Sequence, residues 1–230
     1  RLLGNAMLIL TALIWGCAFV AQSIGMDYVE PFTFSAVRSI LGAAALLPCI
    51  FLFDKLNRKK GIAAGKMNKT LWQGGIVSGL FLGIAINLQQ IGLVYTSAGK
   101  AGFVTALYIV LVPICGVFLH KKAAPSVWVS VVLATGGLYL LCINESLSVN
   151  QGDVLVFLCA FAFTAQILAV EHYAPLVDGM RLACVQFFVC GLVSVIGMLI
   201  WETPDLRGIL AAWKPICYTA FLSSSVGYTL

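Results

Sequence analysis

The sequence predicts an all-α membrane protein, a bundle of helices that cross a lipid bilayer. Of its 230 residues, 61% are hydrophobic and 10% are charged, and the mean hydropathy is +1.00. Soluble domains carry about 25% charged residues, so this chain has too little polar material to cover a soluble fold. Its apolar runs are continuous and about 20 residues long, which suits helices that span a hydrocarbon core. A transmembrane β-barrel would instead alternate apolar and polar residues.

Eight apolar runs are predicted to cross the membrane. The first lies at 5–25. The second, at 31–53, begins with Pro31, a residue that suits the first turn of a helix, and a polar, basic loop follows it. The remaining runs lie at 72–94, 97–119, 125–143, 152–171, 180–201 and 214–230. Because the sequence starts with Arg1 and stops inside the last run, we expect further chain beyond both ends.

The basic residues orient the chain in the membrane. If the N-terminus is cytoplasmic, most of the 14 Lys and Arg residues lie inside, while Arg207, Lys214 and Lys100 lie outside or at the outer edge. Basic loops favour the cytoplasmic side. We therefore predict a multi-pass protein of the cell membrane with a cytoplasmic N-terminus. The net charge of +5 is explained by loops that face anionic lipid, so no nucleic acid is predicted as a partner.

Two stretches of the chain begin alike and indicate an internal repeat. They are GNAMLILTALIWGCAFVAQ, from Gly4, and GDVLVFLCAFAFTAQILAV, from Gly152. Five predicted spans separate the two starts, so the second copy enters the membrane from the opposite side. Inverted repeats of this kind are common in secondary transporters. We therefore predict a first five-helix repeat over 1–145 and a second repeat over 150–230 that ends after about three helices, with ten helices in a complete protein.

Three segments resemble one transporter family. They are LTALIWGCAFV, PFTFSAVRSILGAAALL, which contains Arg38, and YTSAGKAGFVTALYIVLVPICGVFL, and they are similar to the EamA-like branch of the drug/metabolite transporter superfamily. The resemblance implies a ten-helix fold with both termini inside and a central cavity between the repeats. It also implies alternating-access movement of metabolites or amino acids. The glutamate that the family often carries after the fourth span is missing, because HKKAAP stands there.

Two cations in or near the membrane are the first candidates for substrate binding. Arg38 lies about two turns into the second run, where an arginine faces protein or water rather than lipid. Its guanidinium could bind a carboxylate or phosphate, or it could hold helices together. Lys100 lies near the outer end of the fourth run. It either extends toward the headgroups or attracts an anionic substrate at the mouth of the cavity.

Uncharged polar and aromatic residues complete the predicted site. Asn87 and Gln90 share one helix face and either join helices or bind substrate, and the same alternatives apply to Gln166 and Gln186. An inward-facing Trp15 either stacks on a substrate or packs against a neighbouring helix. The predicted substrate-binding residues are Trp15, Gln22, Arg38, Asn87, Gln90, Lys100, Tyr108, Gln166 and Gln186.

Proline and glycine residues mark positions where helices bend or approach closely. Pro113, inside the fourth run, removes one backbone hydrogen bond and frees the carbonyl of Ile109. It is predicted to be a hinge, with a static kink as the alternative. Gly75, Gly79 and Gly83 in the third run indicate close helix packing rather than a ligand site.

The motifs of several other functional classes are missing from the sequence. None of the eight cysteines forms a CxxC pair and there are two histidines, so neither a metal site nor a cofactor is predicted. No nucleotide-binding loop occurs, and the acidic residues fall in loops or at helix ends. We therefore predict a non-enzymatic secondary transporter of small metabolites, with a homodimer left open. The alternatives are a helical scaffold and, less favoured, an intramembrane enzyme. A cavity lined by Arg38, Asn87 and Gln166 would favour transport over a scaffold.

Overall fold

The protein is a bundle of helices. The computed structural model describes residues 2–59, 67–119, 125–142 and 150–228, and every regular element within them is helical. The longer helices are α1 (Leu2–Gly25), α2 (Pro31–Lys59), α3 (Lys69–Tyr95), α5 (Tyr108–Phe118), α6 (Pro125–Cys142), α7 (Gln151–Tyr173) and α8 (Gly179–Trp201). The short ones are α4 (Ala98–Thr105), η1 (Ala174–Leu176), α9 (Leu206–Ala211), α10 (Trp213–Cys217) and η2 (Tyr218–Val226). The all-α prediction is confirmed.

Six candidate membrane spans occur among the described residues. They are α1, α2, α3, the joined pair α4–α5, α7 with η1, and α8, each long and apolar enough to cross a bilayer. The chain is therefore a multi-pass membrane protein. The predicted span 125–143 corresponds to α6, and the predicted span 214–230 begins within α10 and continues through η2, so it is divided into short helical pieces.

Side-chain caps explain where several helices begin. The side chain of Asn68 accepts a hydrogen bond from the backbone N–H of Leu71 at the start of α3, at 2.8 Å. Asn150 and Asp153 form a capping box at the start of α7, and Asp178 caps α8. A cap satisfies backbone N–H groups that the first turn of a helix leaves without a partner. These caps set the ends of the helices that surround the centre of the molecule.

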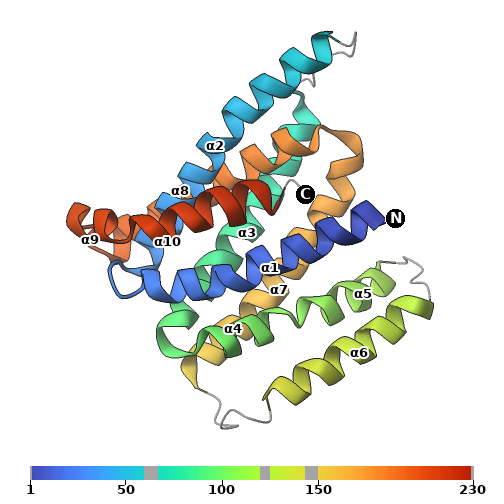
Figure 1. The fold of residues 1–230 in the computed structure, drawn as a ribbon, viewed down its shortest axis with the longest axis vertical. Coiled ribbons are helices and arrows are strands. Elements are labelled where there is room, and N and C mark those ends of the chain that lie inside the picture. Colours follow the sequence, from blue (N-terminus) through green and yellow to red (C-terminus); the bar gives the residue numbers. More distant parts are fainter. Residues whose placement is uncertain (1, 60–66, 120–124, 143–149, 229–230) are drawn as a thin grey trace.

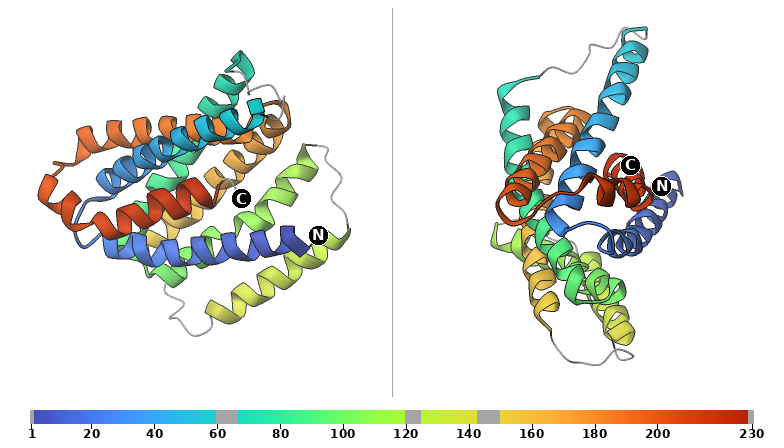
Figure 2. Two further views of the ribbon diagram at one scale, coloured as in Figure 1. Left: turned by 45° about the horizontal axis from the view of Figure 1, so that its top comes forward. Right: turned by 90° about the vertical axis from the view of Figure 1, so that its left-hand side faces the viewer.

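Helix α3 lies at the centre of the bundle (Figures 1 and 2). It packs against α7 and α8, while the C-terminal run α10–η2 packs against α1 and α2. A row of glycines on α3 meets a row of valines on α8, formed by Gly75, Gly79, Gly83, Val185, Val189 and Val193. A Cβ atom added to Gly79 would lie 2.8 Å from the carbonyl oxygen of Gln186, so only glycine fits there. The prediction of close packing by these glycines is confirmed.

The fourth predicted span is broken, contrary to the expectation of one helix over 97–119. Helix α4 ends at Thr105 and α5 begins at Tyr108. Between them, the N–H of Leu107 bonds the carbonyl of Val104 at 3.2 Å, a three-residue spacing that tightens the turn. Pro113 lies further along the chain, inside α5. The interruption therefore occurs at Ala106–Leu107 and not at the proline.

The C-terminal run also departs from a regular helix. After α9 and α10, the chain continues through the wide turns of η2, and the N–H of Gly227 bonds the carbonyl of Leu222 at 2.8 Å. This run lies beside α1 (Figure 1), and the two elements are in contact. Wide turns of this type are frequent at functional sites. Here they bring Ser223, Ser224 and Tyr228 toward the centre of the molecule.

Candidate functional site

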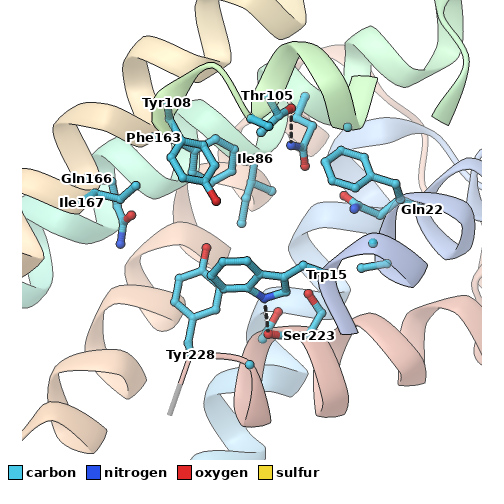
Figure 3. A pocket seen from close by; sticks show the side chains of 18 of the residues that line it. Trp15, Gln22, Ile86, Thr105, Tyr108, Phe163, Gln166, Ile167, Ser223 and Tyr228 are labelled. Carbon is cyan, nitrogen blue, oxygen red and sulfur yellow. Dashed lines mark hydrogen bonds between the residues drawn. The ribbon is translucent and has the colours of Figure 1, made fainter. Parts of the chain in front are cut away.

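A cavity of about 360 Å³ lies between α1, α2, α3, α4–α5, α7, α8 and the C-terminal run. Sites for small molecules usually occupy about 300–1,000 Å³ and are mostly apolar with a few polar groups. This cavity has the same character, since its lining combines aromatic rings with a few amides, hydroxyls and one guanidinium. Figure 3 shows side chains from several helices converging on it.

Aromatic rings form two opposite walls of the cavity. The rings of Trp15 and Tyr228 have centroids 5.3 Å apart, and those of Tyr108 and Phe163 are 6.3 Å apart. In Figure 3 the two pairs face each other across the open space. Phe187 packs against Tyr228 edge-on, at 4.8 Å between centroids. Tilted and edge-on pairs of this kind are favourable aromatic geometries, so each wall is held in place.

Three amides contribute polar groups to the lining. Gln89 donates from Nε2 to the Oγ1 of Thr105 at 3.0 Å, and Gln166 donates from Nε2 to the Oε1 of Gln186 at 3.2 Å. Gln22 is 3% exposed, and its Oε1 has no hydrogen-bond partner within the described residues. A buried carbonyl oxygen without a partner is costly. Gln22 therefore offers an acceptor that a bound molecule can use.

Arg38 supplies the charge of the cavity. Its side chain is 4% exposed, and its Cζ lies 5.7 Å from the centroid of the Phe34 ring. Within the described residues its Nε has no hydrogen-bond partner, and no acid pairs with it. Of the described residues that line the cavity, Arg38 is the one that carries a formal charge. The cavity therefore has an uncompensated positive charge in an apolar surrounding.

Five of the nine predicted binding residues line the cavity: Trp15, Gln22, Arg38, Tyr108 and Gln166. Gln186 lies behind Gln166 and accepts its hydrogen bond. The indole Nε1 of Trp15 donates to the carbonyl of Ser223 at 3.4 Å, which ties α1 to the C-terminal run. The structure thus brings together residues from α1, α2, α5 and α7 that lie far apart in the sequence.

Asn87 and Gln90 do not line the cavity. Asn87 donates to the Oγ of Ser194 at 2.9 Å and so joins α3 to α8, while Gln90 donates to the backbone carbonyl of Gln22 at 3.3 Å and joins α3 to α1. Of the two alternatives left open by the sequence, the geometry fits interhelical hydrogen bonding. The amide of α3 that lines the cavity is Gln89, the residue directly before Gln90.

Lys100 is also not among the residues that line the cavity, although the sequence left open a place for it at the cavity mouth. Its Nζ forms an ion pair with the Oδ2 of Asp153 at 2.6 Å, and 17% of its side chain is exposed. Asp153 accepts a further hydrogen bond from the Oγ1 of Thr96, at 2.7 Å. Lys100 therefore joins α4 to the first turn of α7. This pair could not be predicted from the sequence, because 53 positions separate the two residues.

Several lining residues were missed from the sequence: Phe19, Gln89, Thr105, Phe163, Phe187, Ser223, Ser224 and Tyr228. Gln89 carries the same signal as Asn87, an amide within an apolar run, and could have been included. The phenylalanines carry no such signal, because apolar side chains are found on every face of a membrane helix.

Comparison with known proteins decides the family. The EamA-like transporter family matches residues 2–143, which is more than half of the chain. The chain belongs to the EamA-like transporter family. A transporter of uncharacterized function from Archaeoglobus fulgidus is 35% identical to this EamA-like chain over 196 residues, which are 84% of the chain and 57% of the relative. The family prediction from the sequence is thereby confirmed.

Other similar proteins agree with this family. The uncharacterized transporter YoaV of Bacillus subtilis is 25% identical over 154 residues, which are 66% of this chain and 50% of the relative. The EamA-like chain thus spans about half the length of the curated relatives that it matches. One solved crystal structure aligns with 99% of the chain and 77% of its own, with a TM-score of 0.69 and 17% identity. At that identity the likeness concerns the fold alone.

Proposed function

We propose that this chain forms part of a secondary transporter, which moves small metabolites across the cell membrane by alternating access. The observation that carries the proposal is the central cavity with the buried, unpaired guanidinium of Arg38 in its wall. A charged residue inside a membrane protein is costly and usually serves a function. A scaffold would gain nothing from such a group, and a well-packed apolar residue would be more favourable.

The packing of the helices supports the two inverted repeats, 1–145 and 150–230. If α1 is matched with α7, α2 with α8, and α3 with the C-terminal run, the contacts of α3 with α7 and α8 become contacts of the C-terminal run with α1 and α2. Both sets of contacts occur. This exchange is what a pseudo-two-fold axis in the membrane plane would produce. Rocking of one repeat against the other would then open the cavity to each side in turn.

We further propose an orientation in the membrane and a point of movement within α5. A cytoplasmic N-terminus follows from the distribution of basic residues, and a homodimer is left open. Pro113 stays a predicted hinge within α5. An intramembrane enzyme is the weaker alternative, because the cavity lining within the described residues contains no pair of acids and no nucleophile with a histidine base.

The transport proposal is tested by counterflow. Proteoliposomes of the full-length protein are loaded with an unlabelled mixture of amino acids and organic acids, and the transient uptake of each labelled compound is followed. We expect uptake of at least one compound. Ala106→Trp, which places an indole at the cavity wall, should abolish it. Ala44→Trp, on an exposed face of α2, is the matched control and should leave uptake unchanged.

Two results would contradict transport. The first is a lack of counterflow for every compound with protein that elutes as a single species and unfolds cooperatively, which would favour the scaffold. The second is an equal loss of uptake in Ala106→Trp and Ala44→Trp, which would show that uptake does not depend on the cavity.

A further inference from the structure

We propose that the cavity selects organic monoanions: a carboxylate bound by Arg38, attached to a flat apolar body that lies between the two aromatic walls. This inference rests on the proposed transport function and adds a substrate class to it. It depends on three features of the described cavity lining, namely its charge, its unpaired polar atoms and its rings.

The charge of the lining favours one negative charge on the ligand. Arg38 is 4% exposed and its Nε lacks a hydrogen-bond partner within the described residues. A buried charge without a counterion is strongly unfavourable, and a carboxylate both neutralises a guanidinium and can accept two parallel hydrogen bonds from it. One carboxylate would therefore leave the cavity neutral. A dianionic phosphate would bring a second charge, for which the described lining has no cation.

The charged groups of the lining also disfavour an ammonium group on the ligand. Among the described lining residues there is no aspartate or glutamate that could pair with it. The nearest available attraction would come from the faces of aromatic rings, and the guanidinium of Arg38 shares the same cavity and would oppose it. An α-amino acid should thus bind more weakly than the matching acid that lacks the amino group.

The rings define the shape of the ligand body. Trp15 with Tyr228 and Tyr108 with Phe163 face each other across the cavity (Figure 3). A flat body between two aromatic walls gains stacking or edge contacts on both sides. The volume of about 360 Å³ limits this body to a small molecule. The Oε1 of Gln22 offers one acceptor for a hydroxyl or N–H group on the ligand.

Matched probes separate these contributions. Thermal unfolding of the full-length protein in detergent is measured with 3-phenylpropionate, 3-phenylpropanamide, L-phenylalanine and phenyl phosphate. Benzoate and indole-3-acetate, each with its amide, extend the series. A ligand that binds the folded state raises the melting temperature. We expect the carboxylates to raise the melting temperature. The amides and the zwitterion should bind with an affinity lower by on the order of tenfold, a difference that corresponds to one charge-assisted contact.

Variants link the shift to Arg38. Arg38→Gln should remove the shift caused by 3-phenylpropionate. Arg38→Lys keeps the charge but lacks the planar fork, so it should weaken the shift, and it serves the test if Arg38→Gln does not fold. The matched control is Arg181→Gln. Arg181 is also largely buried, but it pairs with Asp54 outside the cavity, so its loss should lower the melting temperature and keep the ligand shift.

The outcomes distinguish this inference from the transport proposal. Three results would overturn the monoanion proposal: no carboxylate raises the melting temperature, the amide, zwitterion or phosphate binds best, or Arg38→Gln keeps the full shift. Any of these would overturn it even if counterflow of another compound shows transport. If the carboxylates bind through Arg38 but no compound shows counterflow, the site assignment stands and the transport proposal fails.

Discussion

At the residue scale, Asp153 connects three helices through one carboxylate. It accepts hydrogen bonds from Thr96 Oγ1 at 2.7 Å, Lys100 Nζ at 2.6 Å and the backbone N–H of Asn150 at 2.8 Å. Because Asp153→Ala removes the acceptor from all three donors, we expect it to lower the free energy of unfolding by about 3 kcal/mol. Equilibrium unfolding of the purified protein in mixed micelles measures the loss.

The control for this prediction is Lys100→Met, which removes one donor and keeps the apolar stem. Asp153 would retain Thr96 and Asn150 as partners, so we expect a smaller loss of about 1 kcal/mol. An equal or larger loss in Lys100→Met would show that the lysine, and not the shared carboxylate, governs this junction.

The amides of α3 show how far residue-level prediction extends. The sequence identified an amide cluster within an apolar run, and Asn87 and Gln90 do share a face, but the cavity is lined by Gln89. Successive residues point about 100° apart around a helix. In a soluble helix an apolar face would fix the rotation, whereas α3 is apolar around its whole circumference. The residue type of these amides and their depth in the membrane were therefore predictable from the sequence. The direction in which each amide points depends on the neighbouring helices.

At the element scale, the contact between α3 and α8 depends on the absence of side chains. A Cβ atom on Gly79 would lie 2.7 Å from the Cβ of Val189 and 2.8 Å from the backbone oxygen of Gln186. Backbone atoms cannot move aside as a flexible side chain can, so Gly79→Ala should separate the helices. We expect a loss of about 1–3 kcal/mol in the free energy of unfolding, the usual range for overpacking.

A matched substitution is available on α6. A Cβ atom on Gly136 would meet no atom of the described structure within 4 Å. Gly136→Ala should therefore be neutral, or stabilise by about 0.5–1 kcal/mol through the lower backbone entropy of the unfolded chain. If both substitutions have the same effect, helix propensity and not the α3–α8 contact is being measured.

The predicted hinge at Pro113 belongs to the same scale. Pro113→Ala would restore an N–H that can bond the carbonyl of Ile109, so a hinge there would stiffen. We expect a slower counterflow rate with unchanged ligand-induced stabilisation, because Pro113 does not line the cavity. An unchanged rate would instead place the movement at the Ala106–Leu107 break.

That break also shows what the sequence could not reveal about elements. Hydropathy identified an apolar segment at 97–119, and a candidate span, Ala98–Phe118, is present there as the joined helices α4 and α5. Hydropathy depends on composition and is insensitive to whether a turn closes over three, four or five residues. The tight turn at Leu107 and the wide turns before Gly227 are set by packing, so both were missed.

At the scale of the whole molecule, ion pairs join the two proposed repeats at opposite ends. Lys100 pairs with Asp153 between α4 and α7, and Asp54 pairs with Arg181 between α2 and α8, each at 2.6 Å. Figure 1 shows the last turns of α2 and the first turns of α4 and α7 at opposite ends of the bundle. In the proposed orientation the Asp54 pair lies on the cytoplasmic side and the Asp153 pair on the outer side.

If the protein works by alternating access, these two pairs should have opposite effects on the balance between the outward-open and inward-open states. Weakening the outer pair by Lys100→Met should favour the outward-open state, and weakening the inner pair by Asp54→Asn should favour the inward-open state. A bias of 1 kcal/mol changes the ratio of the two states about fivefold.

The readout is the reaction of Ala106→Cys, in an otherwise cysteine-free protein, with an impermeant thiol reagent added outside. Lys100→Met should accelerate labelling and Asp54→Asn should slow it. Reversal of both effects would invert the orientation and keep the rocking movement, whereas effects of the same sign would rule out a rocking movement gated by these pairs.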